Sequence, residues 1–178
     1  MKNKYAVIVV DMLNDFVSGS IAHPRIKNII QPIKDLCDRA RAAGIPVIYA
    51  NDSHDQLDNE FKIWGPHAVK GTWGAEVIDE LKPVEGDFII PKKHYSGFFE
   101  TSMERVLREL GVNTVIITGW QADCCCRHTS ADAFFRGFNI VVPKETTDTL
   151  TQEAYLGALD YIRDIYGGKI CSVKSLKF

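Results

Sequence analysis

The sequence predicts an α/β protein in which helices cover both faces of a mainly parallel sheet. Short apolar runs alternate with longer segments of helical periodicity along the chain. The apolar runs show little polar alternation, which is typical of parallel strands buried on both faces. No internal repeat, low-complexity segment or linker interrupts the alternation. We therefore expect one domain over residues 1–178.

Six short apolar runs are the predicted strands. The first, YAVIVV, is rich in β-branched residues, which favour a pleated and buried conformation. The predicted strands span residues 5–10, 45–50, 87–91, 114–118, 139–143 and 169–173. With helices between them, they give a three-layer α/β/α architecture with right-handed crossovers.

The segments between the strands carry helical signals. Helices are predicted over residues 26–44, 74–81, 101–111, 126–137 and 151–167. In the first helix, Leu36, Ala40 and Ala43 are expected to face inward, Gly44 is the stop, and Pro32 marks the first turn.

The helix at 101–111 begins with a capping-box pattern. Thr101 precedes Glu104 by three residues, a spacing that lets each side chain bond to the other's backbone. Gly111 is the predicted end of this helix.

Composition narrows the class of protein. The hydrophobic fraction of 46%, the charged fraction of 25% and the net charge of −2 are ordinary for a globular protein and give no sign of a nucleic-acid or membrane partner. The first apolar run ends after about six residues at Asp11, which does not resemble a signal peptide. These features predict a cytoplasmic protein. Five cysteines, an odd number, cannot all pair in intrachain disulfides.

Polar residues follow four of the predicted strands. Asp11 follows the first strand, Asp52 and His54 follow the second, Lys92, Lys93 and His94 follow the third, and Gly119 and the cysteine run follow the fourth. Ligands bind at the carboxyl ends of the strands in open parallel sheets. The sequence therefore predicts a functional site at this edge.

Three adjacent cysteines stand after the fourth strand and before a helix. A thiol at a helix N-terminus is favoured as thiolate, but only one of Cys124, Cys125 and Cys126 can point into a site. A vicinal disulfide would be strained, and a thiolate metal site lacks further ligands because Cys37 and Cys171 lie in element interiors. From the residues alone, three small core residues stay an open alternative.

The longest irregular stretch, 51–73, holds a second group of polar residues. Asp52, His54 and His67 are a plausible set for zinc or iron, although the spacing alone favours solvated side chains. A loop of this length in a compact domain is usually functional.

Three stretches carry a resemblance to a known family. They are VVDMLNDF (9–16), PKKHYSGFF (91–99) and TGWQADCCCRHTSADAFFRGF (118–138). The chain resembles, over nearly its whole length, the cysteine hydrolases of the isochorismatase-like superfamily, close to nicotinamidases and N-carbamoylsarcosine-type amidases. The resemblance implies a Rossmann-like, isochorismatase-like hydrolase fold.

The resemblance also implies a catalytic triad. The family nucleophile falls on Cys125, the aspartate on Asp11, and the lysine on Lys92 rather than Lys93. Asp11 would move the proton, and Cys125 would form a thioester with release of ammonia. Lys92 would favour the thiolate and hold Asp11.

A non-proline cis peptide at Trp120–Gln121 is implied as well. It would aim the N–H of Gln121, together with that of Cys125, at the developing oxyanion. Phe16, Trp64, Tyr95 and Trp120 are the aromatic residues expected to line the substrate pocket.

The resemblance strengthens the metal interpretation. Nicotinamidases carry an Asp-x-His after the second strand and a His three residues after a Trp, and Trp64 to His67 repeats that spacing. The implied ligands are Asp52, His54 and His67, with zinc the first choice and iron or manganese as alternatives. No organic cofactor is expected. Relatives also imply a homo-oligomer, a dimer or tetramer. Phe134 and Phe135 could serve its interface, or could equally pack against the sheet.

The predicted function is cleavage of the C–N bond of a small amide, with nicotinamide as the best single substrate. The loops here are shorter than in typical nicotinamidases, so a ureido or N-carbamoyl amidase with the same triad is the alternative. Such a substrate needs a carboxylate-binding group, for which Arg127 or His128 could serve. A non-catalytic redox-sensing thiol protein is the alternative from another class.

Overall fold

The sheet is the centre of the fold. The computed structural model describes residues 4–178. Its strands are β1 (Tyr5–Val10), β2 (Val47–Asp52), β3 (Phe88–Lys92), β4 (Thr114–Trp120), β5 (Asn139–Pro143), β6 (Thr147–Asp148) and β7 (Lys169–Cys171). The sheet order is β3-β2-β1-β4-β5-β7, with β6 paired to β4, and the strand pairs are parallel. The predicted α/β sheet is confirmed, with a short seventh strand that the sequence did not indicate.

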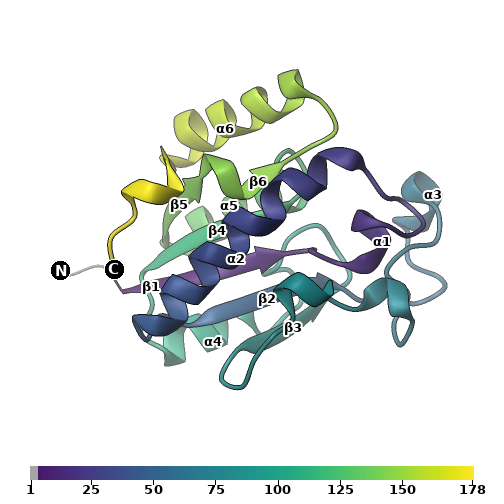
Figure 1. The fold of residues 1–178 in the computed structure, drawn as a ribbon, viewed down its shortest axis with the longest axis horizontal. Helices are drawn as coiled ribbons and strands as arrows, with labels where there is room; N and C mark the ends of the chain where they lie inside the picture. Colours follow the sequence, from purple (N-terminus) through teal and green to yellow (C-terminus); the bar gives the residue numbers. More distant parts are fainter. Residues whose placement is uncertain (1–3) are drawn as a thin grey trace.

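Helices cover both faces of this sheet. They are α1 (Asn14–Val17), α2 (Lys27–Ala42), α3 (Phe61–Trp64), α4 (Met103–Glu109), α5 (Cys125–Phe135) and α6 (Gln152–Tyr166). The apolar side of α2 packs on one face, and α4, α5 and α6 pack on the other (Figure 1). Alternate residues of β1 enter the two cores, Val7 and Val9 toward α2, and Ile8 and Val10 toward the other face. None of the helices within residues 4–178 has the length and apolar content needed to cross a membrane.

The predicted helix at 74–81 is wrong. The segment forms two 3₁₀ turns, Trp73–Ala75 and Asp79–Leu81, with an extended link between them. Glu76 O accepts the N–H of Asn14, and Ile78 N–H donates to Met12 O. These tertiary hydrogen bonds hold the link extended and override its local helical preference.

Three predicted details of helix ends are also wrong. Pro32 lies inside α2, because a 3₁₀ turn at Pro24–Ile26 begins the helix earlier, and Ala43 is exposed just past its end. At α4, Thr101 Oγ1 accepts the N–H of Met103, but the side chain of Ser102, the residue at the N-cap position, makes no capping hydrogen bond. The reciprocal capping box is therefore not formed.

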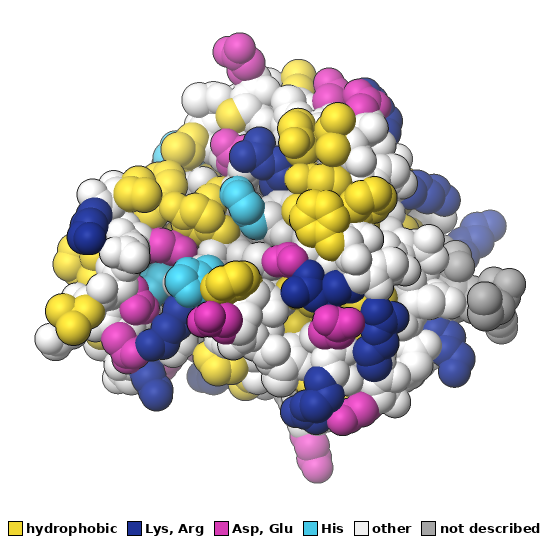
Figure 2. Space-filling view, turned by 180° about the vertical axis from the view of Figure 1, so that it is seen from behind, with side chains coloured by type: hydrophobic (Ala, Val, Ile, Leu, Met, Phe, Trp, Pro, Cys, Tyr) yellow, Lys and Arg dark blue, Asp and Glu magenta, His cyan; other side chains and the backbone are white. Residues whose placement is uncertain are grey.

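An aromatic cluster stands on the surface of α5 and α6. Phe134 and Phe135 are 46% and 71% exposed and contact Tyr166, which in turn contacts Tyr161. Figure 2 shows hydrophobic side chains gathered on the rear face of the molecule. These two phenylalanines thus face outward rather than pack against the sheet.

Candidate active site

The carboxyl ends of four neighbouring strands meet at one edge. Asp11 directly follows β1, and Asp52 and Lys92, the last residues of β2 and β3, are register partners. Gly119, near the end of β4, pairs with Val10. A Cβ at Gly119 would lie 2.0 Å from Val10 O, so the close approach of β1 and β4 requires glycine there.

A lysine between two carboxylates forms the centre of the site. Lys92 is 2% exposed, and its Nζ lies 2.7 Å from Asp11 Oδ2 and also pairs with Asp52 Oδ1. The backbone N–H of Asp52 donates to Asp11 Oδ1 at 2.7 Å. Asp11 is thus held from two sides, and Asp52 serves both this ion-pair group and the cluster described below.

The three charges shift one another's proton affinity. Burial and the Asp52 carboxylate raise the pKa of Asp11 to about 7, against the opposing effect of Lys92. Burial alone would lower the pKa of Lys92, but Asp11 and Asp52 raise it well above its ordinary value. Lys92 therefore stays charged, and Asp11 can both accept and return a proton near neutral pH.

Cys125 is brought to this group as the first residue of α5. Its Sγ lies 3.8 Å from Lys92 Nζ, and it falls within 4.8 Å of a carboxylate oxygen of both Asp11 and Asp52. The neighbouring Cys124 side chain and burial raise the pKa of the Cys125 thiol well above its ordinary value. The Cys124 contact and burial outweigh the opposing effect of Lys92 on this pKa, so the thiol is favoured at rest over the thiolate that the helix position alone would favour. A base is needed, and Asp11 is within reach.

The other two thiols of the run have different surroundings. Cys126 is fully buried against Thr118 O and Thr147 Oγ1, and burial raises its pKa. Cys124 is half-buried and lines the same pocket as Cys125. The cysteines of the described chain are all free thiols. Only Cys125 combines the pocket with the lysine and the carboxylates.

The backbone before Cys125 makes a tight turn. The Trp120–Gln121 peptide bond is cis. Gln121 O accepts the N–H of Cys124 at 3.2 Å and that of Cys126 at 3.0 Å. The hydrogen bonds found within residues 4–178 give the intervening N–H of Cys125 no acceptor. This N–H is available to a substrate oxygen.

The short strand β6 braces this turn. Thr147 Oγ1 donates to Gly119 O at 2.8 Å, and Ala122 N–H donates to Asp148 O at 2.9 Å. Thr149 Oγ1 donates to a carboxylate oxygen of Asp123. The segment that carries the nucleophile is therefore fixed from β6 as well as from its own helix.

Replacing Thr147 with valine is expected to destabilise the fold by about 1–3 kcal/mol, because the buried Gly119 carbonyl loses its donor. Thr72→Val is the matched control, since Thr72 Oγ1 makes the same kind of bond to Val69 O at the surface. In Thr72→Val, water can replace the lost hydrogen bond, so the free energy of unfolding should fall by less than in Thr147→Val. Urea unfolding measures both; equal effects would contradict the bracing role.

A narrow pocket opens beside Cys125. The predicted aromatic residues Phe16, Trp64, Tyr95 and Trp120 all line it. The remaining lining residues are Ile21, Asp52, Glu60, His67, Gln121, Cys124 and Cys125. Trp64 Nε1 donates to Tyr95 Oη at 3.2 Å across it. The free volume is ≈ 20 Å³, about enough for one water molecule, so an aromatic ligand requires these side chains to part.

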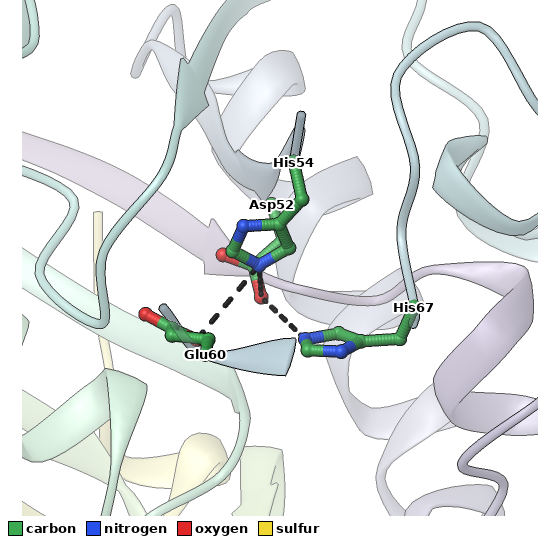
Figure 3. A group of neighbouring side chains, drawn as sticks. All are labelled: Asp52, His54, Glu60 and His67. Atoms are coloured by element: carbon green, nitrogen blue, oxygen red, sulfur yellow. Dashed lines mark ion pairs between the residues drawn. The ribbon is translucent and has the colours of Figure 1, made fainter. Parts of the chain in front are cut away.

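Next to this pocket, four side chains converge on one point. Asp52, His54, Glu60 and His67 present their ligand atoms within 4.8 Å of one another (Figure 3). His54 Nε2 lies 3.6 Å from Asp52 Oδ2 and 3.8 Å from Glu60 Oε2, and His67 Nε2 lies 3.9 Å from Asp52 Oδ2. Ligands at ordinary zinc bond lengths in a tetrahedron stand about 3.4 Å apart. The spacing fits a metal ion after a small contraction.

The outer partners of the two histidines support the same conclusion. His67 Nδ1 lies 2.8 Å from the carbonyl of Gly65, which can only accept, so its proton sits there and Nε2 offers a lone pair. His54 Nδ1 lies 3.1 Å from Asp58 Oδ2, while His54 Nε2 is buried without a hydrogen-bond partner. An orphaned ring nitrogen aimed at two carboxylates is suited to a cation.

Glu60 is the residue of this cluster that the sequence did not indicate. It stands immediately before α3, six residues after His54, in a loop rich in acidic residues. Burial and Asp52 raise the pKa of its carboxyl to about 7. His94, in contrast, is exposed outside this cluster, and its Nε2 lies 4.0 Å from Glu100 Oε2.

Comparison with known proteins defines the class. N-carbamoylsarcosine amidase from Thermoplasma acidophilum superposes with a TM-score of 0.93, at 38% identity over 98% of this chain and 99% of that one. Nicotinamidase from Bacillus subtilis superposes with a TM-score of 0.89, at 29% identity over 95% and 99%. Ureidoacrylate amidohydrolase from Rhizobium rhizogenes is 31% identical over 94% of this chain and 80% of its own length. This chain is accordingly an amidohydrolase that acts on carbon–nitrogen bonds outside peptides.

The family follows from a match along nearly the whole chain. The isochorismatase domain model covers residues 5–175, and the chain belongs to the isochorismatase family. A pyrazinamidase from Pyrococcus horikoshii, whose structure is a complex with zinc, is 29% identical over 95% of this chain and 99% of its own, with a TM-score of 0.89.

Proposed function

We propose that this amidohydrolase removes ammonia from nicotinamide, with Cys125 as the nucleophile. The observation that carries the proposal is the composition of the pocket. Four aromatic side chains line it, and the described lining includes no arginine and no lysine. A flat, uncharged amide suits these walls better than an anionic substrate does.

The site geometry supports the following steps. Asp11 takes the proton of the Cys125 thiol as the sulfur attacks the amide carbon, and the carbonyl oxygen becomes negative. The N–H of Cys125 and the N–H of Gln121 are the proposed donors to that oxygen. Asp11 then protonates the leaving nitrogen, ammonia departs, and a thioester stays on Cys125. Asp11 deprotonates a water molecule that hydrolyses the thioester and restores the thiol.

Lys92 acts on this sequence through charge. Its ammonium lies between Asp11 and Cys125, where it favours the developing thiolate and holds the Asp11 carboxylate in place. Lys92 stays charged because the attraction of the Asp11 and Asp52 carboxylates outweighs the opposing effect of burial.

Asp52, His54, Glu60 and His67 would hold a divalent metal, with zinc the first choice for a nitrogen and oxygen donor set. A bound zinc ion would supply a positive charge that can accept the lone pair of a ring nitrogen. Side chains of the pocket would orient the substrate: Trp64 and Trp120 would stack on the nicotinamide ring. Phe16 supports His67 through an edge-to-face contact, with the two ring centroids 5.6 Å apart.

The metal site is tested by zinc affinity. Wild-type protein is expected to bind zinc, and His54→Ala should lower the affinity by at least about 100-fold, more than loss of an outer-shell partner usually costs. His94→Ala is the matched control, because His94 is exposed outside the cluster. Competition with a chromophoric chelator measures all three. An unchanged affinity in His54→Ala would contradict the assignment of ligands.

A ureido or N-carbamoyl amidase is the second candidate. It is favoured by the 38% identity with N-carbamoylsarcosine amidase. Its substrates carry a carboxylate, and neither predicted partner serves: Arg127 lies over the Tyr161 ring at 5.3 Å, and His128 Nδ1 contacts Cys124 O at 2.8 Å, both outside the pocket lining. The non-catalytic thiol sensor does not fit an amidohydrolase.

Ammonia release decides between the two substrates. We expect kcat/KM for nicotinamide and pyrazinamide to exceed that for N-carbamoylsarcosine by at least about 100-fold, since burying an unpaired carboxylate is costly. The reverse ranking would establish the second candidate. No release from any of the three would overturn both. Assembly into a homo-oligomer stays a prediction.

A further inference from the structure

Asp15 belongs to the VVDMLNDF stretch, yet it takes no part in the proposed chemistry. It lies in α1, half-buried, between two loops that border the pocket. Its Oδ1 accepts the N–H of Ser20 at 3.0 Å, and its Oδ2 accepts the N–H of Ala68 at 2.8 Å. One carboxylate thus joins the segment that carries Ile21 to the segment that carries His67.

The backbone of Ala68 extends this connection to His54. Ala68 O accepts the N–H of His54 at 3.0 Å, and His54 O accepts the N–H of Lys70 at 3.0 Å. Ala68 is fully buried and has a φ of 44°, a conformation that residues other than glycine rarely adopt without support. Asp15 therefore supports Ala68, the residue that directly follows His67 and whose carbonyl accepts the N–H of His54.

The Asp15 carboxylate also lies directly against the backbone of Gly74. A Cβ at Gly74 would lie 2.0 Å from Asp15 Oδ2 and 2.4 Å from its Cγ. Asn14 ties the same segment to α1, through its N–H to Glu76 O at 3.0 Å and its Nδ2 to Trp73 O at 2.9 Å. Any side chain at position 74 would displace the carboxylate.

We propose that Asp15 is a positioning residue that sets the spacing of His54 and His67 for a divalent metal, and so tunes metal affinity from outside the cluster. The inference rests on the metal site of the proposed function. Outer-shell groups of this kind orient the ligand rings, and their loss typically lowers metal affinity about 10–100-fold.

Two variants test the inference from opposite sides. Asp15→Asn keeps the shape, but its amide nitrogen must face one of the two N–H donors. Gly74→Ala leaves every charge in place and displaces the same carboxylate. Both are expected to lower zinc affinity about 10–100-fold and to raise KM for nicotinamide more than they lower kcat.

Matched controls are available in the same chain. Asp35→Asn removes an exposed carboxylate of α2, and Gly157→Ala adds a Cβ that meets nothing within 4 Å in α6. Zinc affinity is read by chelator competition, with circular dichroism and thermal unfolding to establish that each variant is folded.

The outcomes separate the two proposals. A folded Asp15→Asn or Gly74→Ala protein with wild-type zinc affinity overturns the role of Asp15 and leaves the metal site intact. Equal losses in the controls overturn it too. A wild-type protein without measurable zinc affinity overturns the metal site, and this inference with it, whereas ammonia release by Cys125 is judged separately.

Discussion

Replacement of Cys125 by alanine is expected to abolish ammonia release from nicotinamide, with kcat reduced by at least about 10⁴-fold. The reason is geometric. Cys125 Sγ is the nucleophilic atom within reach of Lys92 Nζ and the Asp11 carboxylate, and it opens to the aromatic pocket. Without the sulfur no thioester can form, and the oxyanion donors alone give only residual catalysis.

The control for this experiment is Cys171→Ala. Cys171 is a free thiol at the end of β7, outside the pocket. It should keep wild-type activity, and both variants should keep the wild-type circular dichroism spectrum. Trapping of the thioester by mass spectrometry after rapid acid quench should label Cys125. Near-normal turnover in folded Cys125→Ala would contradict the assignment of Cys125 as the nucleophile.

The second large effect is expected at Lys92. Lys92→Met should lower the free energy of unfolding by about 3–5 kcal/mol, because it leaves the Asp11 and Asp52 carboxylates buried without their cation. Methionine fills most of the volume, so lost packing contributes little. Activity should fall to the level of Cys125→Ala, since neither the thiolate nor the Asp11 geometry is supported.

Lys93→Met is the matched control, one residue further along. Lys93 is exposed and pairs at the surface with Asp55. Surface ion pairs of this kind contribute little to stability, because solvent screens the two charges. Urea unfolding curves for the two variants give the comparison. Equal free energies of unfolding for Lys92→Met and Lys93→Met would contradict a stabilising role of Lys92 between the buried carboxylates.

The edge of the sheet where the site lies was predictable from the sequence. Buried parallel strands are nearly continuous apolar runs, so the polar residues that end them, Asp11, Asp52 and Lys92, stand out. Their distances were not predictable. The contact of Lys92 with both carboxylates depends on the pairing of β1, β2 and β3, which no local pattern encodes.

Features without a local pattern were missed. Glu60 lies in an irregular loop where acidic residues are common, so nothing distinguishes it before the chain folds. Strand β6 has two residues, too few for a periodicity. The surroundings of the Cys125 thiol were not predictable for a related reason. Helix position is visible in the sequence, whereas burial beside Asp11 and Cys124 arises only in three dimensions.

The buried lysine and its two carboxylates have a consequence for how such sequences can diverge. Lys92 is the cation between two buried carboxylates, so its replacement leaves both without a counter-charge, whereas replacement of one carboxylate leaves Lys92 paired with the other. A single substitution at Lys92 is therefore strongly disfavoured while both carboxylates remain. Lineages of this fold should lose Lys92 only after, or together with, the carboxylates that it neutralises.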